Sequence, residues 1–155
     1  MINFQTNSAS QTQDIAKEFA QHLAGGMVLV LDGPLGSGKT TFTQGLGRAL
    51  GVSRAIKSPT FTIVKEYPLA DYPFDLIHID AYRLETGGAD SIDLAYYLSP
   101  EHLVVIEWAE FLVDYLPATY LKLSFHLQTK LSQRQLELSM VGPEDPRYQA
   151  LLASL

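Results

Sequence analysis

The chain has 155 residues, of which 46 % are hydrophobic and 18 % are charged, enough for one globular domain with a buried core over residues 1–155. It contains no cysteine, which excludes disulfides and cysteine-ligated metal sites, and no stretch nears the roughly 18 apolar residues that span a membrane, so we expect a cytoplasmic protein. The net charge is −6 and the 11 lysines and arginines are dispersed, which argues against a protein that binds nucleic acid by itself.

The N-terminal third of the chain predicts a helix, a strand and a second helix. Apolar residues at helical spacing predict the first helix over residues 10–23. Residues 27–31 form an apolar run of strand length, and a glycine-rich turn follows it. A second amphipathic helix then ends at Gly51, a residue type that commonly follows the last helical turn.

The middle of the chain alternates between predicted strands and a short helix. Residues 60–67 alternate between apolar and polar side chains, and residues 74–79 form a second strand pattern. A short helix is expected over residues 91–98. The fully apolar run 103–106 predicts a strand that is buried on both faces, as in a parallel sheet.

Two clean alternations near the C-terminus predict a β-hairpin. They cover residues 121–127 and 136–140, with the turn near residues 130–133. A terminal helix is expected over residues 146–155. Together these elements predict a three-layer α/β fold with a mainly parallel central sheet and a C-terminal antiparallel hairpin extension.

The segment Gly33-Pro34-Leu35-Gly36-Ser37-Gly38-Lys39-Thr40 matches the phosphate-loop pattern G-x-x-x-x-G-K-[ST]. It stands between a predicted strand and a predicted helix, the context in which backbone N–H groups and a helix N-terminus face a polyphosphate. Gly36 and Gly38 leave room for the backbone to wrap around a phosphate. The pattern predicts a P-loop NTPase fold that binds a nucleoside triphosphate.

Three side chains at the end of this loop have the chemistry that Mg²⁺ and phosphates require. Lys39 supplies a positive charge that can bridge the β- and γ-phosphates. Thr40 supplies a hydroxyl for Mg²⁺, which prefers oxygen ligands, and Thr41 can bond the α-phosphate. The sequence therefore predicts Mg²⁺ as the cofactor.

Two apolar strands end in a carboxylate, Asp80 in one case and Glu107 in the other. Carboxyl ends of neighbouring parallel strands meet at one edge of a sheet, where a carboxylate can hold the Mg²⁺ shell or orient water. We expect one to hold the waters of the metal and the other to polarise the attacking water. The sequence leaves open which does which, and either could instead cap the following turn.

Three further residues have two interpretations each. Thr60 lies in Ser58-Pro59-Thr60-Phe61-Thr62, either a switch segment facing Mg²⁺ and the γ-phosphate or a turn that opens a strand. Arg83 could form a structural salt bridge or approach the γ-phosphate. Trp108, the single tryptophan, could pack in the core or lie near the nucleotide.

Four sequence blocks, in their order and spacing, resemble the TsaE family, formerly YjeE, over roughly residues 8–140. Members are small bacterial ATPases required for threonylcarbamoyl modification of tRNA. The combination of blocks is more specific than the phosphate loop alone. The blocks are Gly33–Thr41, Ser58–Thr62, His78-Ile79-Asp80-Ala81-Tyr82-Arg83 and Ile106-Glu107-Trp108.

The resemblance implies an ATPase that is slow in isolation, binds ATP and Mg²⁺, and docks onto the TsaD–TsaB pair, reaching tRNA only through these partners. Its hydrolysis would support repeated threonylcarbamoylation of the adenosine next to the anticodon. The implied catalytic residues are Lys39, Asp80 and Glu107, and the implied Mg²⁺ residues are Thr40 and Glu107. The implied nucleotide-binding residues are Thr12 (near the base), Gly33, Gly36, Ser37, Gly38, Lys39, Thr40 and Thr41.

The chain departs from many relatives at residues 85–90, where glycines replace a longer acidic, leucine-rich stretch, and it shows no match after Gly142. Two other functions are compatible with a phosphate loop. A small-molecule kinase needs a lid with several basic residues. After Glu107 the chain has only Lys122, Lys130, Arg134 and Arg147. A nucleotide sensor that does not hydrolyse ATP would not need both carboxylates.

Overall fold

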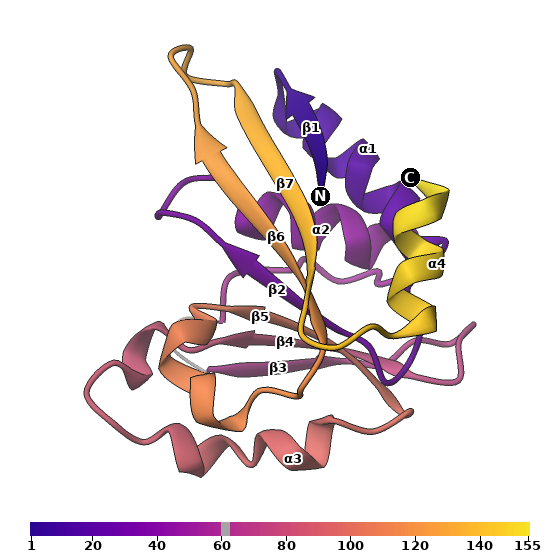
Figure 1. The fold of residues 1–155 in the computed structure, drawn as a ribbon, viewed down its shortest axis with the longest axis vertical. Coiled ribbons are helices and arrows are strands. Elements are labelled where there is room, and N and C mark those ends of the chain that lie inside the picture. Colours follow the sequence, from indigo (N-terminus) through magenta and orange to yellow (C-terminus); the bar gives the residue numbers. More distant parts are fainter. Residues whose placement is uncertain (60–62) are drawn as a thin grey trace.

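A seven-stranded β-sheet runs through the computed structural model, which describes residues 1–59 and 63–155 (Figure 1). The strand order is β1-β7-β6-β2-β5-β4-β3. The strands are β1 (Ile2–Thr6), β2 (Val28–Asp32), β3 (Val64–Tyr67), β4 (Asp75–Asp80), β5 (His102–Glu107), β6 (Tyr120–Leu127) and β7 (Arg134–Val141). The helices are α1 (Ala9–Ala20), α2 (Lys39–Ala49), α3 (Leu94–Tyr97) and α4 (Pro146–Ser154), with 3-10 segments η1 (Tyr82–Leu84), η2 (Ala89–Ile92) and η3 (Ala109–Tyr115).

The sheet is mixed, so the prediction of a mainly parallel central sheet with an antiparallel hairpin extension is confirmed only in part. Strands β6, β2, β5 and β4 are parallel neighbours, whereas β1, β7 and β3 pair antiparallel. Antiparallel strands can lie at sheet edges with one face exposed, and they need no fully apolar run. The prediction missed β1, whose five residues alternate apolar and polar side chains with the burial of an edge strand. The predicted antiparallel hairpin is confirmed in β6 and β7.

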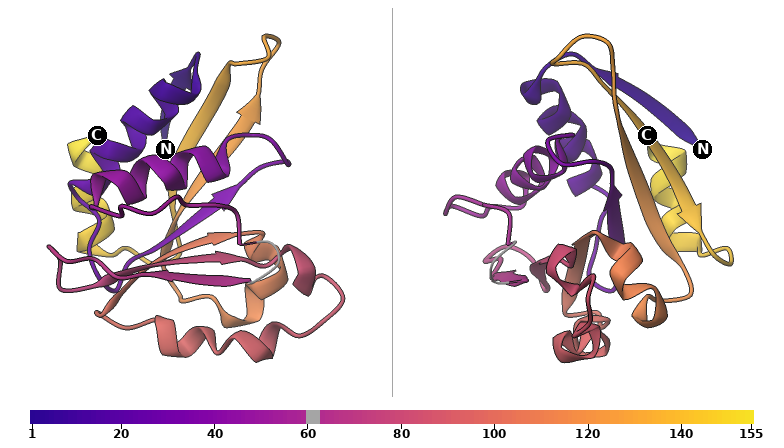
Figure 2. Two further views of the ribbon diagram at one scale, coloured as in Figure 1. Left: turned by 180° about the vertical axis from the view of Figure 1, so that it is seen from behind. Right: turned by 90° about the vertical axis from the view of Figure 1, so that its left-hand side faces the viewer.

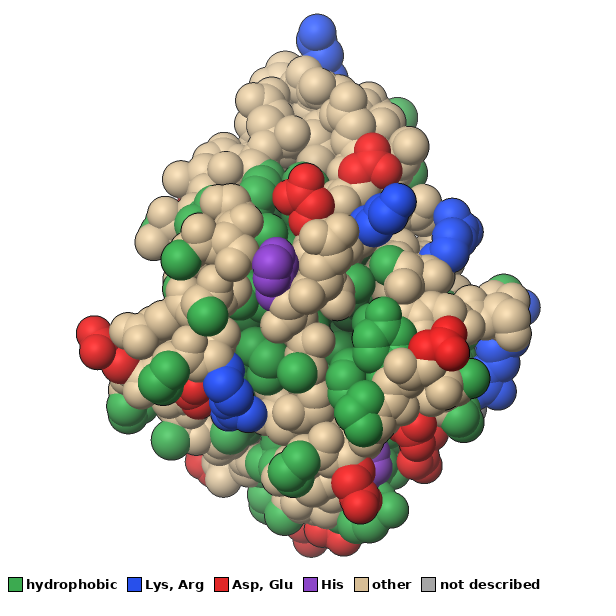
Figure 3. Space-filling model, turned by 90° about the vertical axis from the view of Figure 1, so that its right-hand side faces the viewer, with side chains coloured by type: hydrophobic (Ala, Val, Ile, Leu, Met, Phe, Trp, Pro, Cys, Tyr) green, Lys and Arg blue, Asp and Glu red, His purple; other side chains and the backbone are tan. Residues whose placement is uncertain are grey.

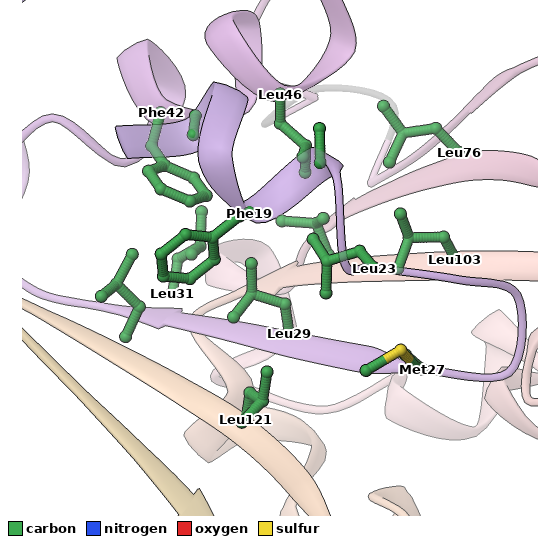
Figure 4. Close-up of a cluster of buried hydrophobic side chains, with 14 of the residues drawn as sticks. Phe19, Leu23, Met27, Leu29, Leu31, Phe42, Leu46, Leu76, Leu103 and Leu121 are labelled. Carbon is green, nitrogen blue, oxygen red and sulfur yellow. The ribbon is translucent and has the colours of Figure 1, made fainter. Parts of the chain in front are cut away.

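Helical segments cover both faces of the sheet and create two cores (Figure 2). Successive side chains of a strand point to opposite faces. In β2, Leu29 belongs to the cluster under α1 and α2, whereas Val30 belongs to the cluster under the 3-10 segments and α3. Figure 4 shows Phe19 of α1 and Phe42 of α2 above Leu29, and the two rings meet edge to face at 5.2 Å. This packing fixes the start of α2 over the end of β2.

Several element boundaries differ from the predictions. Helix α1 ends at Ala20 rather than near residue 23, and its N-cap is Ser8, whose Oγ accepts a hydrogen bond from the Gln11 N–H. The predicted helix over residues 91–98 is divided into η2 and α3, because Asp93 lies between them. Its φ of 53° belongs to the left-handed region, which interrupts a right-handed helix. Of the predicted strand over residues 60–67, β3 covers the last four, and residues 60–62 lie outside the described part.

Across the described residues, no helix is long and apolar enough to cross a membrane. On the face drawn in Figure 3, basic side chains are interspersed with acidic ones and form no continuous basic patch.

The C-terminal helix α4, which has no predicted function, anchors the strand that leads into the phosphate loop. The Tyr148 hydroxyl of α4 accepts a hydrogen bond of 2.8 Å from the N–H of Val28, and both residues are buried. Burial raises the pKa of the Tyr148 phenol above its ordinary value.

Tyr148→Phe should lower the free energy of unfolding by about 1–2 kcal/mol, because the Val28 N–H stays buried without an acceptor. Because the folded-state pKa of Tyr148 is raised, the advantage of the wild type should be complete below about pH 10 and decline above it. Urea denaturation at pH 8 and pH 11 measures both effects. Tyr96→Phe, at an exposed tyrosine, is the matched control. Equal stability of wild type and Tyr148→Phe at pH 8 would contradict the anchoring role.

Candidate functional site

A cleft of about 630 Å³ opens at the carboxyl ends of β2, β4 and β5, beside the N-terminus of α2 and the β6–β7 hairpin. These ends meet because the three strands are parallel neighbours. The lining residues come from all parts of the chain: Ser8, Ala9, Thr12, Leu35, Gly36, Gly38, Lys39, Thr40, Thr41, Ser58, Asp80, Tyr82, Glu107, Trp108, Ser132 and Arg134.

The phosphate loop turns sharply from β2 into α2 and needs glycine at specific places. Gly38 is the N-cap of α2 and has a φ of 108°, a conformation that side chains with a Cβ rarely adopt. A Cβ on Gly33 would lie 2.9 Å from both the Phe125 carbonyl oxygen and the Ser37 Oγ. The loop is therefore packed tightly against β6, and α2 begins with its free N–H groups at the cleft.

Lys39 is a buried cation without a carboxylate partner among the described residues. Its side chain is 5 % exposed, and Nζ donates a 2.7 Å hydrogen bond to the carbonyl oxygen of Gly33. The same Nζ lies 4.2 Å from the centroid of the Trp108 ring. A carbonyl dipole and an aromatic face compensate a buried positive charge only in part. This site is therefore electrostatically suited to an anion.

A second buried group in the loop also lacks a partner. The Ser37 Oγ is fully buried, and it is one of two buried side-chain polar atoms without a hydrogen bond in the part of the chain that the structure describes. The other is Nδ1 of His78. Native structures satisfy most buried polar atoms, so each exception calls for a physical explanation.

Asp80 and Glu107 lie side by side at the ends of β4 and β5, where they are register partners. Both are about 3 % exposed and both line the cleft. Asp80 accepts hydrogen bonds from the Tyr82 N–H at Oδ1 and from the Ser58 hydroxyl at Oδ2. The two carboxylates and the Thr40 hydroxyl line the same cleft, and oxygen ligands of these types are the ones that Mg²⁺ prefers.

His78 holds Glu107 in place from beneath the cleft. Its Nε2 and the Glu107 Oε2 share a hydrogen bond of 2.6 Å, and the two side chains are 0 % and 4 % exposed. His78 belongs to β4 and does not line the cleft, so it acts on the site only through the carboxylate. The bond engages one carboxylate oxygen and fixes the orientation of Glu107.

Most of the predicted site residues meet in the cleft. The lining includes Thr12, Gly36, Gly38, Lys39, Thr40, Thr41, Asp80, Glu107 and Trp108. Thr12 is buried and its Oγ1 lies 3.0 Å from Oγ1 of Thr6, so it is tied to β1. Gly33 and Ser37 belong to the loop beneath the cleft.

Three predicted residues have different outcomes. Arg83 is exposed in η1 and is not among the described residues that line the cleft. Thr60 lies outside the described residues, so its predicted switch role stays a prediction. Trp108 lines the cleft beside Lys39, and its ring packs against Tyr82 with centroids 5.0 Å apart.

Four residues of the site have no predicted role, namely Arg134, Tyr82, His78 and Ser132. Arg134 is 97 residues from Ser37 along the chain, yet its guanidinium reaches the phosphate loop. Nothing in the local pattern around Arg134 could signal this contact. The block His78-Ile79-Asp80 could have indicated His78, because a histidine two residues before a strand-end carboxylate lies on the same face of the strand.

His78→Phe should lower the free energy of unfolding by about 3 kcal/mol, because it leaves the buried Glu107 carboxylate without its partner. His78→Gln can keep an N–H donor near the position of Nε2 and should be less destabilising. Urea denaturation measures both. His126→Gln is the matched control, because it removes a largely exposed histidine–glutamate pair and should change stability by less than about 0.5 kcal/mol. A His78→Phe protein as stable as the wild type would refute the role of this bond.

Comparison with known proteins gives consistent results. The model of the family described as Threonylcarbamoyl adenosine biosynthesis protein TsaE matches residues 6–136. The tRNA threonylcarbamoyladenosine biosynthesis protein TsaE of Bacillus subtilis (strain 168) is 36 % identical over 154 residues, which cover 99 % of this chain and 93 % of that protein. The TsaE protein of Streptomyces coelicolor is 44 % identical over 115 residues, which cover 72 % of this chain and 76 % of that protein.

A solved structure has the same fold. The crystal structure of Bacillus subtilis YdiB superimposes with a TM-score of 0.81 and 31 % sequence identity, covering 98 % of this chain and 91 % of that one. The family model spans well over half of the chain, and the Bacillus subtilis relative matches it nearly from end to end. The chain therefore belongs to the TsaE family.

Proposed function

We propose that this chain is a Mg²⁺-dependent ATPase that binds ATP in the cleft and acts as an accessory subunit of the TsaD–TsaB complex. Its hydrolysis supports repeated threonylcarbamoylation of the tRNA adenosine next to the anticodon. Family membership supports the pathway. The nucleotide chemistry rests on the cleft itself.

The buried Lys39 carries the proposal. Its ammonium has a carbonyl oxygen and an aromatic ring as partners, and no carboxylate among the described residues. A phosphate supplies the missing negative charge, and the free N–H groups at the start of α2 supply further donors. Lys39 and these backbone groups bind the β- and γ-phosphates, while Thr41 lies two residues further along for the α-phosphate. Thr12, at the far side of the loop on α1, lies near the base.

Thr40 and Glu107 hold Mg²⁺ in this proposal, which leaves several coordination positions to water and phosphate oxygens. When bound, the ion neutralises charge on the phosphates. His78 keeps Glu107 oriented, because its bond to Oε2 restricts the rotation of the carboxylate. Asp80 is fixed from two sides by Tyr82 and Ser58, so it stays beside Glu107 and can polarise the attacking water.

Thr60 and Arg83 complete the proposal as groups that act in the assembled complex. Ser58, which precedes Thr60 by two residues in the sequence, donates a hydrogen bond from its hydroxyl to Asp80. Arg83 follows Tyr82, a residue that lines the cleft and contacts Trp108. Partner-dependent placement of such groups would explain slow hydrolysis by the isolated chain.

The charge of the chain supports indirect contact with tRNA. Its net charge is −6, and basic and acidic side chains are interspersed on the face shown in Figure 3. Proteins that bind nucleic acid alone usually gather basic residues into a patch. TsaD and TsaB therefore hold the tRNA in this proposal.

The test is phosphate release from ATP and Mg²⁺ by the purified chain, alone and with TsaD–TsaB. We expect a slow basal rate that the pair increases. Glu107→Gln should lower the stimulated rate by roughly 100-fold, because the variant keeps the shape of the side chain but loses the charge at the metal. Glu110→Gln, the same change at an exposed position three residues later, should leave the rate unchanged.

The outcomes separate this function from its alternatives. Intact ATP binding without stimulation, and full tRNA modification by Glu107→Gln, would contradict the proposal and favour a nucleotide sensor. Transfer of phosphate to a hydroxyl compound rather than to water would contradict it in favour of a kinase.

A further inference from the structure

The β6–β7 hairpin is tied to the phosphate loop by one side chain, Arg134. This residue is the first of β7. Its Nε donates a 2.9 Å hydrogen bond to the carbonyl oxygen of Ser37, and its Nη2 donates one of 3.1 Å to that of Gly36. The planar edge of a guanidinium carries these two donors in a fixed fork, which matches two successive carbonyl groups.

The other side of the guanidinium holds the turn of the hairpin. Nη1 donates to the carbonyl oxygens of Leu131 at 2.6 Å and Gln133 at 2.7 Å. Within the described part of the chain, no carboxylate pairs with Arg134. Arg134 therefore bonds four backbone carbonyl groups. Its contact with the loop depends on the direction of these hydrogen bonds rather than on a salt bridge.

Peptide geometry links these bonds to the anion site. In a planar trans peptide, the C=O and the N–H of one unit point in opposite directions. Because the Ser37 carbonyl points toward Arg134, the N–H of Gly38 points away from it, and Gly38 lines the cleft at the start of α2. The preceding unit is fixed as well, since its C=O bonds Arg134 and its N–H donates to the Pro34 carbonyl oxygen at 3.2 Å.

Without Arg134, the Ser37–Gly38 peptide unit would lose the hydrogen bond that fixes the direction of its carbonyl group. Glycines with positive φ stand on both sides of Ser37, namely Gly36 at 74° and Gly38 at 108°. Glycine allows other backbone conformations at low steric cost. A rotation of the Ser37–Gly38 unit would turn a carbonyl oxygen toward the phosphates and replace a donor by a repulsive dipole.

We propose that Arg134 is a positioning residue that keeps the carbonyl groups of Gly36 and Ser37 turned away from the anion site. The N–H of Gly38 thereby stays aimed at bound phosphate. This inference deepens the proposed function and rests on its nucleotide site. The same residue pairs with Thr6 of β1 in the sheet, and the Thr6 hydroxyl bonds Thr12 in the cleft, so Arg134 stands at a rigid junction.

The experiment is isothermal titration calorimetry of ADP and of inorganic tripolyphosphate, each with Mg²⁺, on the full chain. We compare the wild type with Arg134→Gln and Arg134→Lys. Arg134→Gln should weaken both ligands by roughly tenfold or more, since a loop that rotates freely loses directed donors. Arg134→Lys should also bind weakly, because one ammonium keeps the charge but cannot span both carbonyl groups in a fixed fork. Lys130→Gln, at an exposed lysine of the same hairpin, is the matched control and should bind like the wild type.

Each result has a defined meaning. Equal losses for ADP and tripolyphosphate, in variants that remain folded by circular dichroism, support loop positioning. Wild-type affinity in Arg134→Lys would overturn it, because charge alone would then suffice. A loss confined to ADP would also overturn it, since Arg134 would then contact the nucleoside. A lower melting temperature with unchanged affinity would assign Arg134 a purely structural role.

These readouts distinguish the inference from the proposed function. Binding does not require hydrolysis, so an inactive wild type with Arg134-dependent binding would refute the ATPase and leave the inference standing. A wild type that binds neither ligand would refute both.

Discussion

The burial of the Lys39 ammonium is the constraint on which the site depends. The chain places a cation in a cleft and provides a carbonyl oxygen and the Trp108 ring as its partners. Such a charge is costly unless an anion completes its surroundings. The packing of α1 and α2 on β2, the tight turn at Gly33 and the anchoring of β2 by α4 all hold this lysine at the mouth of the cleft. This rigid scaffold thus keeps the Lys39 ammonium buried although no carboxylate among the described residues compensates its charge.

The register of the parallel strands supplies the second half of the chemistry. Asp80 and Glu107 are neighbours because β4 and β5 are aligned residue for residue, and each carboxylate has its own hydrogen-bond support. The acidic pair and the Lys39 ammonium of the phosphate loop line the same cleft. A metal-bound polyphosphate carries both signs of charge, so it can complement the lysine and the carboxylates of one cleft.

The sequence predicted those features that depend on local pattern. The phosphate loop, the strands that end at Asp80 and Glu107, and the C-terminal hairpin follow from periodicity and short motifs, and the resemblance to the TsaE family was confirmed. Contacts between distant segments could not be predicted. The bond from Arg134 to Ser37 and the antiparallel pairing of β1 with β7 join segments that lie far apart in the chain, so no local pattern encodes them.

The most direct test of this account is a crystal structure of the chain with a non-hydrolysable ATP analogue and Mg²⁺. The account predicts phosphates at the N-terminus of α2, with the Lys39 ammonium moved from the Gly33 carbonyl oxygen onto the β- and γ-phosphates. The metal should lie between Thr40 and Glu107. A structure in which Lys39 keeps its bond to Gly33 while the analogue binds elsewhere would contradict the account.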